Sequence, residues 1–345
     1  MNKRFIEKKL KEVLYPGLDK DIVSLKCIKK IEPSVDKVRI EINISNESVF
    51  EQIETQISKL LENDFKFIDI AFVANQKPSI NYGNTKKPNN RAPFAKNIIA
   101  VTSGKGGVGK STVSVNLSVS LAQMGYKVGL LDADVYGPNT PRMLGLQDEK
   151  LQWNDEDKML PCENYGIKLM SVGLTTPKSD TPLVWRSSVA ISALIQFLED
   201  VAWGELDFLV IDMPPGTGDI QLTMAQELPL TTSVIVTTPQ AISTDDVSRA
   251  VMMFKDIGVP IGGIVENMSC FIAPDTGAKY DIFGSGGGEI ISQRYSIPFL
   301  GSIPLTMAIR ETSDAGKPAV VTDDKAQKSY YKNIAQNLLA QIGIL

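Results

Sequence analysis

The chain has 345 residues, 43% of them hydrophobic and 22% charged, and this composition is typical of a globular protein with room for a large and a small domain. Its net charge of −4 gives no support for a nucleic-acid partner, no apolar run is long enough to span a bilayer, and the charged segment 1–11 is not a signal peptide, so we expect a cytoplasmic protein without a membrane partner. The sequence has no histidine, which excludes imidazole bases and histidine-bound metals, and its three scattered cysteines do not suggest a disulfide scaffold.

Residues 1–74 are predicted to form a small α+β domain. Apolar residues recur at helical spacing in two segments and alternate with polar residues in a third, which indicates two helices and a half-buried strand. Residues 75–93 are rich in Asn, Lys and Pro and have no apolar period, so they are predicted to be a flexible linker. The predicted elements of the small domain are helix 5–14, strand 22–31, strand 38–44, helix 49–61 and strand 67–73.

Residues 94–345 are predicted to form one large α/β domain. Short apolar or β-branched runs alternate with helical patterns, which favours a mostly parallel sheet with helices on both faces. Ligands of such sheets bind beyond the carboxyl ends of the strands. The predicted strands are 98–101, 127–131, 207–211, 233–237, 261–265 and 299–303, and the clearest helices are 113–124, 245–258 and 326–345.

A glycine-rich loop follows the first of these strands and leads directly into a helix. This context is required for a loop that binds phosphates through backbone N–H groups at a helix N-terminus. Lys110 is placed to reach the β- and γ-phosphates of a nucleotide, and the Ser111 hydroxyl can ligate Mg²⁺. The predicted binding residues are Gly104, Lys105, Gly106, Gly107, Val108, Gly109, Lys110, Ser111 and Thr112.

Carboxylates stand at the ends of the next two strands. Asp212 precedes Pro214-Pro215-Gly216 and can hold Mg²⁺ through water, while the N–H near Gly216 is expected to be free to meet a γ-phosphate. Asp132 and Asp134 end the other strand, and one of them can orient or deprotonate a water molecule, since there is no histidine to do so. The alternatives are a helix N-cap for this pair and a rigid turn with an exposed acid for Asp212.

The segment Glu266-Asn267-Met268-Ser269 is predicted to end a further strand. Guanine-specific relatives of such proteins carry an Asp in this region that pairs with the guanine edge, whereas this chain has Met268 and Cys270 where their Lys and Asp stand. ATP is therefore favoured over GTP. Asn267 is a candidate to bind the adenine, and a loop-capping amide is the alternative.

The loop form K-G-G-x-G-K-S-T resembles the deviant Walker A motif of the MinD/ParA/nitrogenase-iron-protein class of ATPases. Together with LLDADVYGPN, DMPPGTGD, TTPQ and ENMS, it makes residues 94–343 similar to the Mrp/ApbC family of iron–sulfur cluster carrier ATPases. The resemblance implies a P-loop fold, a homodimer that binds ATP and Mg²⁺, and a bridging [4Fe–4S] cluster passed to apo-proteins. It implies catalytic roles for Lys105, Lys110 and Asp134, with Lys105 reaching the partner's nucleotide, and it places Asp132 beside the Mg²⁺.

One departure from the family concerns the cluster. Members carry C-x-x-C shortly after ENMS, so that a dimer supplies four thiolates, but this chain has Ala273-Pro274-Asp275-Thr276 there. Cys270 lies three residues earlier, and a symmetric dimer could bring two such thiols together, with Asp275, an external thiol or a client completing the ligand set. The alternative is a reduced, unligated Cys270.

Two other functions stay open at this point. One is a positioning ATPase of the MinD/ParA type, which the acidic charge and a C-terminal helix with only Lys328 and Lys332 as cations do not favour. The other is a regulatory ATP-binding protein of the same fold that has lost the cluster.

Overall fold

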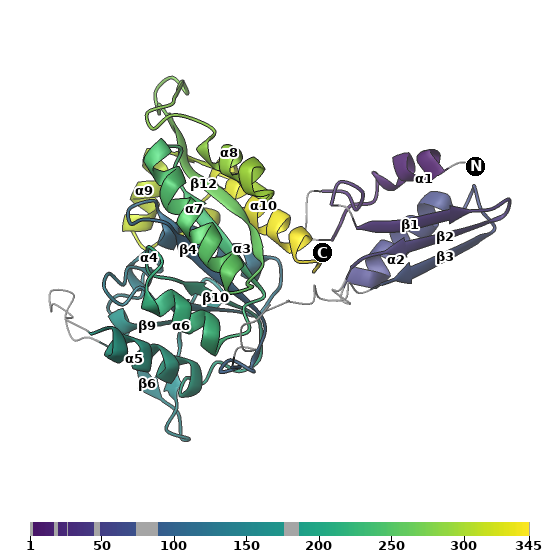
Figure 1. Ribbon diagram of the computed structural model, residues 1–345. Coiled ribbons are helices and arrows are strands. Elements are labelled where there is room, and N and C mark those ends of the chain that lie inside the picture. The colour runs from purple at the N-terminus through teal and green to yellow at the C-terminus, as the bar shows by residue number, and fades with distance from the viewer. Residues whose placement is uncertain are drawn as a thin grey trace. The chain divides into compact units, whose positions relative to one another are not determined.

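The computed structural model describes residues 3–16, 20–25, 27–44, 49–73, 89–175 and 186–344, with only the backbone described for 241–245. The chain divides into two compact units, residues 1–79 with 336–345, and residues 80–335 (Figure 1). The predicted boundary at residue 74 and most of the predicted linker lie outside the described residues, so this division of domains stays a prediction. At the end of the linker, the Asn89 N–H donates to the Gln226 carbonyl, and Arg91 pairs with Glu199 and Glu227.

The small unit contains a three-stranded sheet and two helices. The predicted alternation is confirmed in the central strand, where Val38 and Ile40 are buried and Lys37 and Arg39 are exposed. The first helix ends at Leu10, earlier than predicted. The elements are α1 (Lys3–Leu10), β1 (Ile28–Pro33), β2 (Lys37–Ile42), α2 (Phe50–Leu61) and β3 (Phe67–Phe72), with β2 antiparallel to β1 and parallel to β3.

The strand predicted to begin at Ile22 begins at Ile28. The Asp21 carboxylate accepts hydrogen bonds from the N–H groups of Val23 and Ser24, at 3.0 and 2.8 Å. These bonds hold a turn before the strand, because an aspartate side chain competes with the sheet for nearby N–H groups.

The large unit is built on a mostly parallel sheet, as predicted. Its strand order is β13-β12-β11-β4-β10-β5-β9-β8, with β14 also paired to β12. Only the short strands β8 and β13 run antiparallel to their neighbours. The strands are β4 (Ala95–Ser103), β5 (Val128–Asp132), β8 (Cys162–Asn164), β9 (Ile167–Ser171), β10 (Leu206–Asp212), β11 (Thr232–Thr237), β12 (Ile261–Ile272), β13 (Lys279–Tyr280) and β14 (Phe299–Leu305); β6 (Gln152–Trp153) and β7 (Met159–Leu160) form a separate pair.

Helices cover both faces of this sheet (Figure 1). The chain moves from β4 past β10 to β5, and then in the opposite direction from β9 through β10 and β11 to β12 and β14. Because crossovers between parallel strands are right-handed, α3 lies on one face and α5 to α8 on the other. The helices are α3 (Lys110–Gln123), α4 (Thr140–Met143), α5 (Ser187–Glu199), α6 (Asp219–Glu227), α7 (Ala241–Asp256), α8 (Gly287–Tyr295), α9 (Met307–Asp314) and α10 (Lys325–Gln341).

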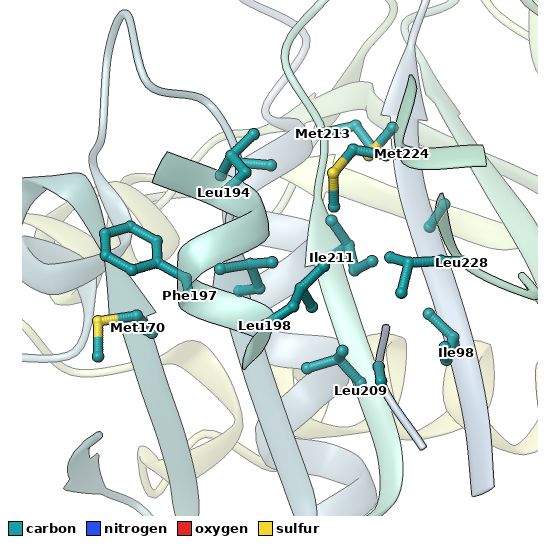
Figure 2. Close-up of a cluster of buried hydrophobic side chains, with 14 of the residues drawn as sticks. Ile98, Met170, Leu194, Phe197, Leu198, Leu209, Ile211, Met213, Met224 and Leu228 are labelled. Atoms are coloured by element: carbon teal, nitrogen blue, oxygen red, sulfur yellow. The ribbon is translucent and has the colours of Figure 1, made fainter. Parts of the chain in front are cut away.

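The central strands are buried on both faces, which explains why they appear in the sequence as continuous apolar runs. One core lies between the sheet and helices α5 and α6 (Figure 2). In it, Ile98 and Ile211 from the sheet pack with Leu198 from α5 and Met224 from α6.

Three further predictions about elements were incomplete. The helix predicted over 245–258 starts at Ala241, and Gly258, with φ of 74°, follows its end as expected. The segment 266–269 does not end its strand, since β12 continues to Ile272 after an irregularity at Met268, whose φ is 55°. Neither β9 nor α5 was predicted. No helix in the described part of the chain is both long and apolar enough to cross a bilayer.

Truncating Leu198 to alanine should destabilise the large unit by about 2–5 kcal/mol, because this side chain is 1% exposed in the core between α5 and the sheet. Urea unfolding measures the change. Val189→Ala on the same helix is the control, since Val189 is 54% exposed and its truncation should change the free energy of unfolding by less than about 0.5 kcal/mol. Equal effects of the two substitutions would contradict the placement of α5.

Candidate functional site

The glycine loop joins β4 to α3 as predicted, with β4 ending at Ser103 and α3 beginning at Lys110. Gly107 and Gly109 have φ of 79° and 81°, in the left-handed region that favours glycine. A Cβ on Gly104 would lie 2.3 Å from the Asp246 backbone carbon at α7, so no larger residue fits. The loop's glycines are therefore needed both for its turn and for its close packing.

Lys110, Ser111 and Asp212 meet at the carboxyl ends of β4 and β10. The Lys110 Nζ lies 2.8 Å from Asp212 Oδ1, and Ser111 Oγ donates to Asp212 Oδ2 at 2.6 Å. Ser114, one turn further along α3, donates to Asp212 Oδ1, also at 2.6 Å. A hydroxyl and a carboxylate side by side at a helix N-terminus are oxygen donors that fit Mg²⁺, and the ammonium beside them fits phosphate.

Asp132 lies on β5 directly opposite Asp212 on β10. Its Oδ2 accepts hydrogen bonds from Thr140 Oγ1 at 2.7 Å and Ser171 Oγ at 3.1 Å, and its Oδ1 accepts the Asp134 N–H. Burial, and then the charge of Asp212, raise the pKa of the Asp132 carboxyl above its usual value. Since protein donors engage both of its oxygens, its place next to Mg²⁺ stays a prediction.

Asp134 has the most exposed carboxylate of the three aspartates at this site. Its Oδ2 lies 3.8 Å from the Lys110 Nζ, and its side chain is 17% exposed. Burial raises the pKa of this carboxyl, and the Lys110 charge opposes that shift. A carboxylate with a raised pKa beside the phosphate loop suits the predicted role of positioning or deprotonating water. No metal site formed by three Asp, Glu or Cys side chains is found among the residues that the structure describes.

The loop after Asp212 differs from the prediction in one respect. The Gly216 N–H is not free, because it donates to the Ser103 carbonyl at 2.9 Å. Gly216 has φ of 88°, so this turn also favours glycine. A γ-phosphate could use this N–H only by replacing or sharing the Ser103 carbonyl.

Lys105, the additional lysine of the glycine loop, contacts the residue that precedes α7 in the same chain. The Lys105 Nζ lies 3.2 Å from Gln240 Oε1, at the residue that precedes α7. Reaching a partner's nucleotide would require Lys105 to leave this contact, and that role stays a prediction.

Asn267 lies against the glycine loop. Its Nδ2 donates to the Val108 carbonyl at 2.8 Å, and a Cβ on Gly109 would lie 2.2 Å from the same Nδ2. This contact matches the loop-capping alternative. Recognition of adenine by Asn267 stays a prediction.

Cys270 is half-buried on β12, before the hairpin turn that joins β12 to β13. In that turn the Ala273 N–H donates to the Ala278 carbonyl, and Asp275 Oδ1 accepts the Thr276 N–H at 2.9 Å. The segment in place of C-x-x-C is therefore an ordinary tight turn whose carboxylate has a local partner. It does not fit a site in which each chain supplies two thiolates.

Several residues that build the site were not predicted. Thr140, Ser171 and Ser114 hydrogen-bond to the aspartates, and Gln221 Nε2 donates to carbonyls of the loop that follows Asp212. Of these, Ser114 carried a local signal, because it lies one turn after Lys110. Gln221 carried a weaker one, since it is a polar residue on the otherwise apolar face of α6.

Comparisons with known proteins agree with this site. Residues 95–339 match the ParA family, described as NUBPL iron-transfer P-loop NTPase. An "Iron-sulfur cluster carrier protein" from Deinococcus radiodurans is 42% identical over 334 residues, 95% of this chain and 92% of that protein. One from Aquifex aeolicus is 48% identical over 242 residues, 70% of this chain and 66% of its own length. A nucleotide-binding protein in complex with ADP from Archaeoglobus fulgidus has a similar structure, with a TM-score of 0.58 and 39% identity, covering 66% of this chain and 89% of that one.

Asn267→Ala should weaken the binding of ATP and GTP by the same factor, because the lost contact holds the loop and not the base. Because this hydrogen bond already holds the loop before a nucleotide binds, its energy of about 1–3 kcal/mol sets an upper bound of roughly 5- to 150-fold on the loss in each affinity. Calorimetric titration of both nucleotides measures this. A loss confined to ATP would instead establish the adenine role.

Proposed function

The chain belongs to the ParA family of iron-transfer P-loop NTPases, and on that premise we propose that it is an ATP-dependent carrier of iron–sulfur clusters. The resemblance to the Mrp/ApbC carriers and the predicted P-loop fold are both confirmed. The observation that carries the nucleotide part of the proposal is the contact of Lys110 and Ser111 with Asp212 at the loop.

For the reaction, we propose slow hydrolysis of ATP by a homodimer. Lys110, with Lys105 from the partner subunit, would stabilise charge on the γ-phosphate, and Ser111 with Asp212 would hold Mg²⁺. Asp134 would position the attacking water. The nucleotide would act as a switch that changes the affinity of the dimer for its cargo or for an apo-protein client. A cytoplasmic location stays a prediction.

The cargo site is proposed to be incomplete in each dimer. Two Cys270 thiolates would bind the cluster, and an external thiol or the client would supply the remaining ligands. Asp275 is a weaker candidate than the sequence suggested, because its Oδ1 accepts bonds within the turn. The names of the relatives do not favour a MinD-type positioning role.

Lys110→Ala should abolish ATP hydrolysis, because the ammonium beside the phosphates is removed. Phosphate release measures the activity, and circular dichroism verifies the fold. Lys96→Ala is the control, since Lys96 lies near the start of β4, at the opposite end of the strand, and pairs with Asp207. Hydrolysis that survives in Lys110→Ala would contradict the proposed active site.

Anaerobic reconstitution with iron and sulfide should load a labile cluster on the wild type and much less on Cys270→Ser. Iron and sulfide are counted per dimer, and Cys162→Ser serves as the matched control because it replaces a cysteine outside β12. A wild type that binds no cluster would favour the regulatory alternative. Full loading of Cys270→Ser would remove Cys270 from the cargo site.

A further inference from the structure

The loop that links β10 to α6 is wrapped around one buried amide. Gln221, in the first turn of α6, is 1% exposed. Its Nε2 lies 2.7 Å from the Pro214 carbonyl, 3.3 Å from that of Pro215 and 2.9 Å from that of Gly216. The amide of one side chain thus contacts three consecutive backbone carbonyls in the loop that follows Asp212.

These contacts also determine where the loop's donor points. In a trans peptide the carbonyl and the next N–H point in opposite directions. Because the Pro215 carbonyl faces Gln221, the Gly216 N–H faces away from it, and it donates to the Ser103 carbonyl at 2.9 Å. Neither Pro214 nor Pro215 has an N–H, so Gly216 carries the first donor after Met213.

This donor lies beside the phosphate loop. Ser103 is the last residue of β4, and its hydroxyl donates to the Lys105 carbonyl at 2.8 Å. A Cβ on Gly106 would lie 3.9 Å from the Pro215 ring. The side of the loop that faces away from Gln221 is therefore the side that would contact a nucleotide bound at the phosphate loop.

The amide is buried next to the apolar core. Gln221 and Met224 are three residues apart on one face of α6, and Met224 packs with Met213 and the core (Figure 2). An apolar side chain of similar length would fill the same space but would leave the loop's carbonyls without a donor.

We propose that Gln221 is a positioning residue: it holds the loop so that the Gly216 N–H faces the phosphate loop and can donate to the γ-phosphate of ATP when that phosphate replaces or shares the Ser103 carbonyl. This inference rests on the proposed ATPase function. Gln221 contacts neither the nucleotide nor the metal in this proposal and acts only through the loop from Pro214 to Gly216. Its loss should therefore affect ATP, which has a γ-phosphate, and spare ADP, which has none.

The test compares Gln221→Met, which keeps the volume, and Gln221→Ala with the wild type. Gln226→Ala is the control, because this second glutamine of α6 has an exposed side chain. We expect kcat to fall roughly 10- to 100-fold in both Gln221 variants, the effect of a donor misplaced by about 1 Å. The affinity for ADP should stay within about twofold, while that for a non-hydrolysable ATP analogue falls.

Each other outcome has a defined meaning. Equal losses of ADP and analogue affinity, or failure of both variants to fold, would make Gln221 a structural residue only and overturn the inference. Wild-type kcat in both variants would also overturn it. If the wild type itself hydrolyses no ATP, the proposed function fails, and the difference between ADP and analogue binding still decides the role of Gln221.

Discussion

The contact between Lys110 and Asp212 is the interaction on which the site depends. Both side chains are buried, at 6% and 0% exposure, and two ions taken out of water are stable together only when their remaining polar atoms are also satisfied. Ser111 and Ser114 supply those hydrogen bonds from the first turns of α3. The strand order supplies the rest, because β10 lies between β4 and β5 and so brings Asp212 between the glycine loop and Asp132. The sheet, the loop and the helix N-terminus are all needed to hold this one pair.

The acids around Lys110 differ in environment, and this suits them to different tasks. Asp212 is in contact with the ammonium, whereas Asp132 is fully buried among neutral donors and has a raised pKa. Asp134 is the most exposed of the three and has its carboxylate 3.8 Å from the Lys110 Nζ. Thr140 and Ser171, which reach Asp132 from α4 and β9, oppose the rise in its pKa that burial and the charge of Asp212 cause.

The sequence predicted the site where its signals are local. The glycine loop, the acids at strand ends and the parallel sheet each follow from residues close together in the chain, and the structure contains all three. What was missed depends on contacts between distant segments. The Gly216 N–H was expected to be free because nothing near it in the sequence indicates Ser103 as its acceptor. Asn267 lies 159 residues from Val108, and β9, which brings Ser171 to Asp132, lacks a pattern that separates it from its irregular surroundings. Strand β12 continued past the polar segment 266–269 because pairing with β13 and β14 outweighed its weak local preference.

Because β12 is long, it carries both the residue that contacts the phosphate loop and the cysteine proposed to bind the cargo. Asn267 holds the phosphate loop, and Cys270 follows it by three residues on the same strand, just past the irregularity at Met268. A displacement of the Val108 carbonyl by a nucleotide would therefore act directly on the segment that carries the thiol. Thermodynamic linkage makes such coupling reciprocal: whatever factor ATP applies to the affinity for cargo, cargo must apply to the affinity for ATP. If Cys270 binds the cargo as proposed, strand β12 would connect the two ligand sites.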